Sequence, residues 1–457
     1  MSGAYATVMS NNNLTEIDLS GNIVVVGLGV TGLSVVRYLC GKGMLPVVID
    51  SRENPPGEEE LKQQYPDVKK YFGVFNKDSL ATAKQLVVSP GLSISSPEFE
   101  YAKSQGVEIV GDIELFARDV DAPVIAITGS NGKSTVTTLV GEVFAKSDVK
   151  AGVGGNIGLP ALDLLNKGNQ VYVLELSSFQ LETLSNLKPV SSVVLNISED
   201  HLDRYDSMQG YIAAKEKIYN NTDVSVINRD DAVVSKMIVS NKSIGFTLHE
   251  PKNNDFGLKE VDGESWICRN NRLLINTTDL FVGGLHNVAN IMAVLALCDS
   301  FDLPEEKVFS AIKMFGGLPH RMQCVAIGNN IKWFNDSKAT NVGAAEAAIN
   351  GLTGNVILIA GGESKDADLS SLKKPVSEYV KAMIVIGRDA ILLENVCQDV
   401  TEVVHASCMY DAVVKANDLA KSGDTVLLSP ACASFDMFKN YAHRGDVFND
   451  AVKAVLS

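Results

Sequence analysis

Two glycine-rich stretches of this chain have the residue types and spacing that bind phosphate groups. In the first, an apolar run from Ile23 leads into Gly27, Gly29 and Gly32, a helix-like run follows, and Asp50 closes the next apolar run. This is the spacing of dinucleotide-binding folds, in which the glycines allow a diphosphate to approach the start of a helix. Read alone, it predicts a nicotinamide dinucleotide as ligand.

The second stretch, VIAITGSNGKST over residues 124–135, predicts a second phosphate loop between a strand and a helix. Backbone N–H groups at such a turn face a phosphate, Lys133 would neutralise the β- and γ-phosphates, and Ser134 would ligate Mg²⁺. The loop has only two residues between Gly129 and Gly132, where the common pattern has four. A glycine-rich turn with an incidental lysine is the alternative, and ATP is the favoured ligand.

The two loops favour different chemistry, and the first is the weaker indication. A lone G-x-G-x-x-G requires only a tight turn and a diphosphate at a helix N-terminus, and UDP carries a diphosphate as well. Asp50 could hold a ribose hydroxyl of either nucleotide, or simply end a strand.

Polar residues also follow later apolar runs, where ligands bind in open α/β sheets. Glu175 ends the run VYVLEL, and His201 follows SVVLNI in the segment LNISEDHLDRY. A carboxylate and an imidazole there could hold Mg²⁺, although a helix cap or a solvated loop explains either residue alone. Lys215, in the helix-like run YIAAKEKIYN, reads on pattern alone as a solvated lysine.

The elements that must position these residues are buried parallel strands alternating with helices. Continuous Val, Ile and Leu runs predict strands covered on both faces, and therefore an α/β fold. A chain of 457 residues suggests about three domains. We place them at 1–111 (Rossmann-like, the first ~20 residues a polar extension), 112–317 (a central P-loop mononucleotide-binding domain) and 318–457 (Rossmann-like). The polar segment 240–276 predicts short antiparallel strands inserted in the central domain.

Composition narrows the partners and the compartment. A net charge of -15 with no basic stripe argues against a nucleic-acid partner. No apolar run approaches the ~18 residues of a membrane span, and the N-terminal residues lack a secretory leader pattern, so a cytoplasmic location is expected. The seven cysteines lack zinc or redox spacing and are expected to be reduced core residues.

Nine motifs, taken in order, resemble those of the ATP-dependent Mur ligases. They are TGSNGKST (128–135), GGNIGLP (154–160), LELSSFQLE (174–182), EDHLDRY (199–205), AAKEKI (213–218), GLHNVAN (284–290), GLPHR (317–321), NDSKATN (335–341) and SPACASFDMFKN (429–440). The GLGVTG start and the last two motifs look like the members that add D-glutamate to UDP-N-acetylmuramoyl-L-alanine, rather than those that add L-alanine, a diamino acid or a dipeptide.

The resemblance implies a role for each matching position. The UDP substrate would contact Gly29, Val30, Thr31, Asp50, Ser51, Arg52, Ser89, Pro90, Gly91, Asn156 and Ser178. ATP would contact Gly129, Ser130, Asn131, Gly132, Lys133, Ser134, Thr135, Asn290, Arg321, Asp336 and Lys338. D-glutamate would contact Thr340, Lys365, Ser434 and Tyr441, although the family has phenylalanine at position 441 and GGESKDAD around Lys365 differs slightly from its pattern.

The same resemblance implies the metal site and the reaction. One or two Mg²⁺ ions would be held by Ser134, Glu175, His201 and Lys215, the last as a carbamate formed with CO₂. Lys133, His201 and Lys215 would be catalytic. The chain would be an ATP-dependent amide-forming ligase of peptidoglycan precursor synthesis, with an acyl-phosphate intermediate, and a monomer. The alternatives are an NAD-dependent oxidoreductase and a nucleotide-binding homologue without activity.

Overall fold

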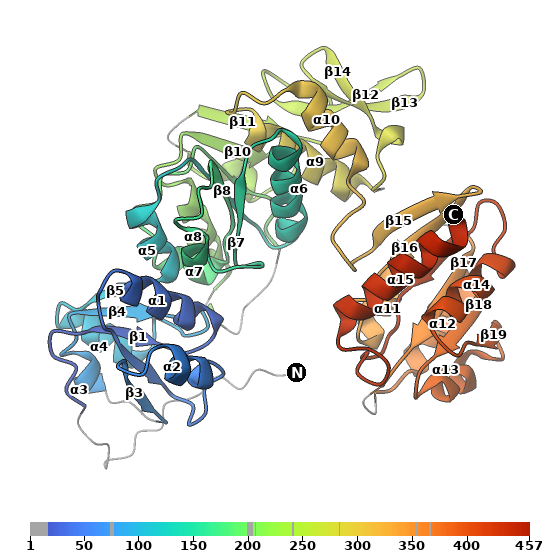
Figure 1. Ribbon diagram of the computed structural model, residues 1–457. Coiled ribbons are helices and arrows are strands. Elements are labelled where there is room, and N and C mark those ends of the chain that lie inside the picture. The colour runs from blue at the N-terminus through green and yellow to red at the C-terminus, as the bar shows by residue number, and fades with distance from the viewer. Residues whose placement is uncertain are drawn as a thin grey trace. The chain divides into compact units, whose positions relative to one another are not determined.

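The structure is a computed structural model that describes residues 17–73, 77–198, 204–205, 207–239, 242–282, 284–352, 354–364 and 367–457. The chain divides into two compact units. The first contains residues up to Asp279 together with the segment that ends at Lys313, and the second contains Leu280–Val282 and Met314–Ser457. Two sheets lie in the first unit and one in the second (Figure 1). The mixed α/β class predicted from the apolar runs is confirmed, whereas the residue boundaries between domains remain a prediction.

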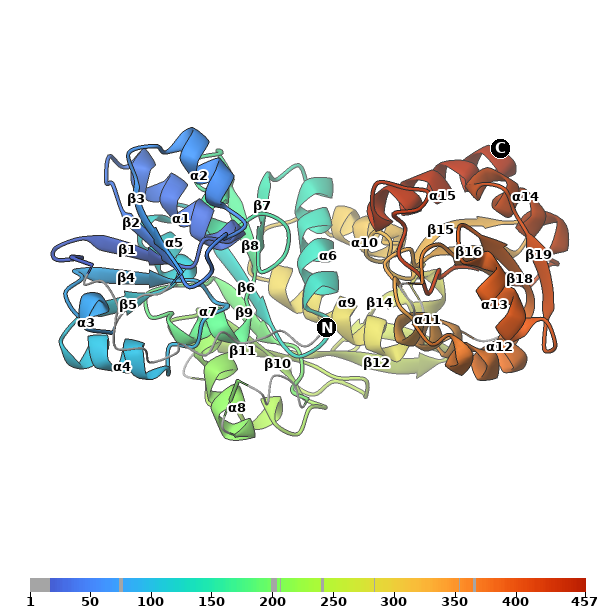
Figure 2. The same ribbon diagram turned by 90° about the horizontal axis from the view of Figure 1, so that it is seen from below.

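The first sheet is a five-stranded parallel sheet with the order β3-β2-β1-β4-β5. Its strands are β1 (Ile23–Val26), β2 (Val47–Asp50), β3 (Lys69–Phe72), β4 (Gln85–Val88) and β5 (Glu108–Val110). The helices are α1 (Val30–Gly41), α2 (Glu58–Gln64), α3 (Lys77–Leu80) and α4 (Pro97–Ser104). Apolar residues of α1 and α2 cover one face and those of α3 and α4 the other, as Figure 2 shows. The sheet is therefore doubly wound, and its strand order reverses between β1 and β4.

The central sheet has nine strands in the order β14-β13-β12-β11-β10-β9-β6-β8-β7. The strands are β6 (Val124–Thr128), β7 (Ala151–Gly155), β8 (Val171–Glu175), β9 (Ser191–Val194), β10 (Val224–Asn228), β11 (Lys242–Phe246), β12 (Phe256–Val261), β13 (Glu264–Arg269) and β14 (Arg272–Asn276). The helices are α5 (Asp112–Asp119), α6 (Lys133–Lys146), α7 (Ser178–Glu182), α8 (Met208–Glu216), α9 (Leu285–Cys298) and α10 (Glu305–Met314).

The polar segment of the central sheet is only partly antiparallel. Strands β12, β13 and β14 pair antiparallel, as predicted, and extend the same sheet. Strand β11 instead continues the parallel part beside β10, so the prediction was wrong for that strand. The physical reason is the continuous buried run at its end, Ile244 to Phe246, which is typical of a strand covered on both faces.

The sheet of the second unit has the order β15-β16-β20-β17-β18-β19. The strands are β15 (Gln323–Gly328), β16 (Ile331–Asn335), β17 (Val356–Gly361), β18 (Val380–Ile386), β19 (Glu402–His405) and β20 (Thr425–Leu428). An antiparallel hairpin of β15 and β16 opens it, and the other pairs are parallel. Helices α11 (Val342–Asn350), α12 (Lys373–Tyr379) and α13 (Ala390–Cys397) cover one face, and α14 (Met409–Leu419) and α15 (Tyr441–Leu456) cover the other.

Direct contacts join the two sheets of the first unit. Arg37 of α1 forms a two-point ion pair with Asp163, through Nε at 3.0 Å and Nη2 at 2.5 Å. One hydrophobic core also runs continuously through residues of both sheets. The first and central sheets are therefore packed as one body.

Five of the seven cysteines are buried, as expected for core residues: Cys268, Cys298, Cys324, Cys397 and Cys432. Cys40 is half-buried and Cys408 is exposed, so the core prediction was wrong for Cys408, which precedes α14 at the surface. Among the helices described, none is both long and apolar enough to cross a bilayer.

Candidate active site

The first glycine-rich loop lies at the point where the strand order of the first sheet reverses. Gly27 has φ +93°, a conformation that strongly favours glycine. A Cβ on Gly32 would lie 1.9 Å from the carbonyl oxygen of Gly27, so only glycine allows α1 to start this close to the loop. Ligands of open α/β sheets bind at such a reversal, beyond the carboxyl ends of the strands.

Asp50 organises that loop from within. Its Oδ2 accepts a hydrogen bond from Leu28 N at 2.7 Å, and Arg52 donates to both oxygens, from Nε at 2.8 Å and Nη2 at 2.6 Å. Arg52 N donates to Oδ1 as well, at 2.9 Å. Burial alone would raise the pKa of Asp50, but these donors together hold it below its usual value. The carboxylate is fully committed to the loop, so a ribose hydroxyl could bind it only by displacing a present donor.

A second turn follows β4 beside the first loop. Ser89 donates from Oγ to the carbonyl of Gly27 at 3.0 Å, and its N–H donates to Val26 O at 2.9 Å. The predicted UDP contacts of this sheet therefore gather at one edge, on the ends of neighbouring strands β1, β2 and β4. They are Gly29, Val30, Thr31, Asp50, Ser51, Arg52, Ser89, Pro90 and Gly91.

The second glycine-rich loop joins β6 to the N-terminus of α6, as its sequence predicts. Gly132 takes the left-handed conformation at φ +82° and is the N-cap of α6, which leaves the first N–H groups of the helix without side-chain caps. Lys133 donates from Nζ to the carbonyls of Gly129 and Ser130, both at 2.8 Å. Ser134 and Thr135 lie half-buried in the first turn of α6. N–H groups without side-chain caps and a positive helix end fit a phosphate.

The loop is tethered by the segment that follows β9. Ser130 N donates to Asn196 O at 2.9 Å, and Asn131 N donates to Asn196 Oδ1 at 2.8 Å. Asn290 of α9 lies against its other side, since a Cβ on Gly132 would be 2.6 Å from Asn290 Oδ1. A predicted ATP contact over 150 residues away in sequence is thus beside the phosphate loop.

Glu175 ends β8, next to β6 in the sheet, and is 2 % exposed. Asn156 donates from Nδ2 to Oε1 at 2.8 Å and from its backbone N to Glu175 O. Oε2 is buried with no hydrogen-bond partner among the residues described. A buried carboxylate oxygen without a donor fits a cation. Ser178, predicted to contact the UDP substrate, is buried at the start of α7, which a reciprocal Ser177 and Gln180 capping box begins.

Lys215 is 2 % exposed, so the solvated-lysine interpretation was wrong. Its Nζ donates to the carbonyl of Gly129 at 2.9 Å and to Thr128 Oγ1 at 3.3 Å, and it lies 4.8 Å from the ring centre of Tyr211. The sequence pattern did not predict this burial, because the buried face of α8 is only weakly apolar. Its residues are Tyr211, Ala214 and Lys215. The lysine points at the phosphate loop rather than at solvent.

Two predicted residues, His201 and Lys365, lie outside the residues that the structure describes. Within the described part of the chain, no three His, Cys, Asp or Glu residues cluster as a metal site. The predicted ligands Ser134, Glu175 and Lys215 stay predictions in that role.

In the second unit, Asp336 follows β16 and is 5 % exposed. Oδ1 accepts from Met322 N at 3.2 Å, and Oδ2 accepts from Ser429 Oγ at 2.8 Å. Burial raises the pKa of Asp336 to about 6, because these neutral donors and Arg321 compensate only partly for the lost hydration.

The other predicted residues of this unit gather at the carboxyl ends of β16 and β20. Lys338 is exposed, with Nζ 5.8 Å from the ring centre of Tyr441, which is 36 % exposed. Thr340 is half-buried just before α11, whereas Ser434 is 2 % exposed in the segment after β20. Arg321 is exposed beside His320, which has φ +61°.

Arg444, which sequence analysis missed, holds these loops together. It is 1 % exposed on α15 and donates to Ser337 Oγ and Ser337 O, at 3.0 and 2.9 Å. It also donates to Cys432 O at 3.1 Å and Gly361 O at 3.4 Å. Burial lowers its pKa to about 10, so it stays charged at neutral pH. No sequence feature marks this arginine, because its partners are mostly backbone carbonyls on three separate loops.

Tyr211 was missed as well, although its spacing offered a signal. Its hydroxyl lies 3.0 Å from Ser130 Oγ, and it precedes Lys215 by one helical turn. Residues four apart share a helix face, so a tyrosine and lysine at this spacing are side by side.

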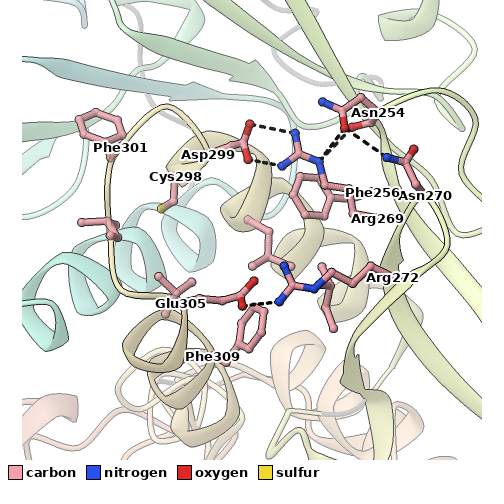
Figure 3. Close-up of a pocket in the computed structure, with 14 residues that line it drawn as sticks. Asn254, Phe256, Arg269, Asn270, Arg272, Cys298, Asp299, Phe301, Glu305 and Phe309 are labelled. Atoms are coloured by element: carbon pink, nitrogen blue, oxygen red, sulfur yellow. Dashed lines mark hydrogen bonds and ion pairs between the residues drawn. The ribbon is translucent and has the colours of Figure 1, made fainter.

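A cavity of about 510 Å³ lies elsewhere, between the β12–β14 strands and the α9–α10 connection (Figure 3). Arg269 pairs with Asp299 and Arg272 with Glu305 at its wall. Of the described residues that were predicted to bind substrate or metal, none lines it.

Comparison with known proteins identifies three consecutive family matches. Residues 21–111 match the Mur ligase MurD-like N-terminal domain, residues 127–298 the Mur ligase middle domain, and residues 320–432 the Mur ligase glutamate ligase domain.

Curated relatives are similar over nearly the whole chain. A UDP-N-acetylmuramoylalanine–D-glutamate ligase of Nitrosococcus oceani is 46% identical over 450 residues, covering 98% of this chain and 99% of that protein. One of Pseudomonas putida is 47% identical over 433 residues, covering 94% and 96%.

Solved structures share the fold at low identity. A UDP-N-acetylmuramoyl-L-alanyl-D-glutamate–2,6-diaminopimelate ligase has a TM-score of 0.57 at 17% identity, covering 96% of this chain and 93% of that one. A UDP-N-acetylmuramate–alanine ligase of Thermotoga maritima has a TM-score of 0.50 at 20% identity, covering 95% and 99%.

Proposed function

The chain belongs to the Mur ligase family, and from this premise we propose that it joins D-glutamate to UDP-N-acetylmuramoyl-L-alanine, with ATP converted to ADP and phosphate. The main support is the similarity over nearly the full chain, at 46% and 47% identity, to relatives named for this reaction. The phosphate loop and the Lys133 that starts α6 supply the matching chemistry. A nicotinamide-dependent oxidoreductase would leave that loop unexplained.

The reaction must activate a carboxylate, because a free carboxylate does not acylate an amine at neutral pH. The γ-phosphoryl group of ATP is transferred to the L-alanyl carboxylate, giving an acyl phosphate. The amine of D-glutamate then attacks its carbonyl carbon, and the tetrahedral intermediate expels phosphate as the amide forms. The first step brings two anions together, so cationic groups must offset their charge.

Lys133 and the N-terminus of α6 are the groups of this chain that we assign to the transferred phosphoryl group. Lys133 must leave the two loop carbonyls that it now contacts in order to reach a phosphate. Asn196 accepts hydrogen bonds from Ser130 N and Asn131 N, which fixes the loop backbone. The remaining ATP contacts that we propose are Gly129, Ser130, Asn131, Gly132, Ser134, Thr135, Asn290, Arg321, Asp336 and Lys338.

Magnesium, when bound, would supply positive charge to polarise the phosphoryl oxygens. The unpartnered Oε2 of Glu175 supports this part of the proposal, together with the hydroxyl of Ser134 at the start of α6. We assign His201 to the same ion. Lys215 as an ammonium offers only donors, so it could serve there only after it loses a proton and the neutral amine reacts with CO₂. That reaction releases a second proton and leaves a carbamate anion with two oxygens. Its burial beside the phosphate loop supports that modification.

The two substrates are assigned to different strand ends. The UDP part would lie at the carboxyl edge of the first sheet, where the strand order reverses between β1 and β4. Asn156 and Ser178 would contact the muramoyl part. Thr340, Lys365, Ser434 and Tyr441 would hold D-glutamate, because hydroxyls and a cation suit its two carboxylates. The pathway is cytoplasmic peptidoglycan precursor synthesis, on which cell shape and division depend, and we expect a monomer.

The proposal is tested by phosphate release from ATP with UDP-N-acetylmuramoyl-L-alanine, while single amino acids are supplied in turn. We expect release to depend on D-glutamate, with L-glutamate and D-aspartate at least ~100-fold poorer in kcat/KM, since buried polar groups reject a mismatched partner. Equal use of L-glutamate would overturn the D-glutamate assignment. Release with none of the amino acids would point to a nucleotide-binding homologue without ligase activity.

A further inference from the structure

We propose that Arg204, between β9 and α8, is a positioning residue for the uridine-side subsite of the first sheet. Arg204 donates from Nη2 to Leu92 O at 2.7 Å and from Nη1 to Pro90 O at 3.3 Å. Both carbonyls belong to the turn after β4, and Arg204 is more than 100 residues away in sequence. The inference rests on the proposed function, which places the UDP substrate at this turn.

The turn is held from both sides. On one side, Ser89 donates to the carbonyl of Gly27 in the glycine-rich loop. On the other, the two carbonyls point at the guanidinium of Arg204. The turn thus bridges the loop and the central sheet, and its backbone position depends on a side chain that the first sheet does not contain.

The guanidinium is itself fixed in place. The side chain of Arg204 is 4 % exposed and lies 4.2 Å from the ring centre of Phe179 on α7. Its Nη2 is 3.5 Å from Glu182 Oε2 at the end of the same helix. A planar guanidinium that stacks on an aromatic ring and donates from its edge to two carbonyl oxygens has a geometry that lysine cannot reproduce.

A row of aromatic rings continues from this arginine to the phosphate loop. Phe179 stacks on Tyr205 at 6.0 Å, and Tyr205 meets Tyr211 edge to face at 5.5 Å. The Tyr211 hydroxyl is 3.0 Å from Ser130 Oγ. The turn after β4 and the phosphate loop of the central sheet therefore contact opposite ends of the same row of packed side chains. This row sets the separation between the two nucleotide subsites.

The test compares two arginines with similar surroundings. Arg204→Met keeps the apolar stem and removes the fork. The matched control is Arg269→Met, because Arg269 also lies over a phenylalanine, Phe256, at 4.9 Å and pairs with Asp299, away from the predicted site. Arg204→Lys retains charge without the fork. Binding of UDP alone is measured by calorimetry, and KM for each substrate and kcat by phosphate release.

We expect Arg204→Met to weaken UDP binding and to raise KM for the UDP substrate about 10-fold, the loss expected from removing charge-assisted hydrogen bonds. KM for ATP and kcat should change less than about 3-fold, a change no larger than the loss of one weak surface interaction would cause. Arg204→Lys should be intermediate, and Arg269→Met should leave every kinetic constant unchanged. Should Arg204→Met fail to fold, the lysine variant alone decides.

The outcomes separate this inference from the proposed function. Unchanged UDP binding and KM in a folded Arg204→Met or Arg204→Lys protein would overturn the positioning role while the wild type still releases phosphate with D-glutamate. A lower melting temperature of Arg204→Met with equal changes in KM for ATP and the UDP substrate would show a purely structural role and would also overturn the positioning role. If wild-type protein binds UDP but shows no D-glutamate-dependent release, the proposed reaction fails and the UDP measurement still tests Arg204.

Discussion

The two glycine-rich loops of the first unit have the same local architecture and different surroundings. Each joins a buried parallel strand, β1 or β6, to the N-terminus of a helix, at a reversal of strand order. Beside the first loop, Asp50 accepts hydrogen bonds from Arg52 and from the loop backbone at Leu28 N. Around the second, Lys133 and Lys215 both donate to loop carbonyls.

This difference teaches that a glycine pattern specifies a backbone shape and not a ligand. In the first loop Asp50 and Arg52 pair with each other, and the N-terminus of α1 has no side-chain cap. In the second, two lysines converge on the same carbonyl, that of Gly129, and a nucleotide phosphate offers them stronger acceptors. We therefore expect the first loop to bind a ligand without reacting with it, and the second to take part in phosphoryl transfer.

The largest effect should come from removing the lysine of the second loop. Lys133→Ala should lower kcat by about 1000-fold or more, because its charge is needed as the phosphoryl group moves. UDP binding, measured by calorimetry, should stay at the wild-type value. Lys146→Ala, an exposed lysine at the end of the same helix, is the control and should keep wild-type turnover. Near-normal turnover of folded Lys133→Ala would remove the distinction between the loops.

Lys215→Ala should lose about 100-fold in kcat, the range expected when a group that orients a metal site is removed. If the lysine works as a carbamate, acetate or formate should restore part of the activity by returning negative charge to the vacated space. Phosphate release with and without these anions checks it, beside the exposed-lysine variant Lys236→Ala. Wild-type turnover without added anion would contradict the carbamate role, and intact-protein mass spectrometry can seek the added CO₂ directly.

Gly32→Ala should damage the first loop alone. The new Cβ would lie 1.9 Å from a backbone oxygen, which cannot move cheaply, so we expect a loss of about 3 kcal/mol in stability and weaker UDP binding. Gly29→Ala is its control for folding, because a Cβ there meets nothing within 4 Å. Melting temperatures and UDP titrations of the pair check this. Equal stability of both variants would show that the close approach is not required.

Asp50→Asn should cost about 2 kcal/mol in stability, because an amide cannot accept the charge-assisted bonds of Arg52 at both oxygens. The pH dependence has a definite sign. Since the folded pKa of Asp50 lies below its unfolded value, its contribution is complete above the unfolded value, about 3.9, and is lost as pH falls through the folded one. Denaturation of wild type and Asp50→Asn at pH 7 and in acid should therefore converge at low pH. A constant difference across pH would contradict the ionic role.

Sequence reasoning succeeded where a residue acts close to its own strand or helix. The class of fold, both loops and the strand-end position of Glu175 follow from apolar runs and glycine spacing, which act over a few residues. The Mur ligase resemblance then supplied a reaction that the residues alone left open between two nucleotides. The resemblance was needed because the local shape of the first loop does not distinguish UDP from a dinucleotide.

It failed where partners come from distant segments. Lys215 is buried against Thr128 and Gly129, which lie more than 80 residues earlier in the chain. The distribution of apolar residues along α8 does not predict this burial. The role of Asp50 as a ribose contact stays a prediction, but the hydrogen bonds that Leu28 N and Arg52 donate to its oxygens were not foreseen. Such pairings depend on tertiary packing, which local periodicity does not contain.

Arg444 has a consequence for the order in which the chain is made. The loops that carry Ser337, Gly361 and Cys432 leave the ribosome before the arginine that fastens them. The parallel strands of the second unit can pair first, but the carboxyl edge that bears Asp336 and Ser434 stays loose until α15 docks. Because buried carbonyls without donors are costly, that edge should be the last part to gain protection from proteases during synthesis. Chains stalled between α14 and α15 would then have both glycine-rich loops folded, while the loops at the carboxyl edge of the second unit's sheet would still lack their arginine.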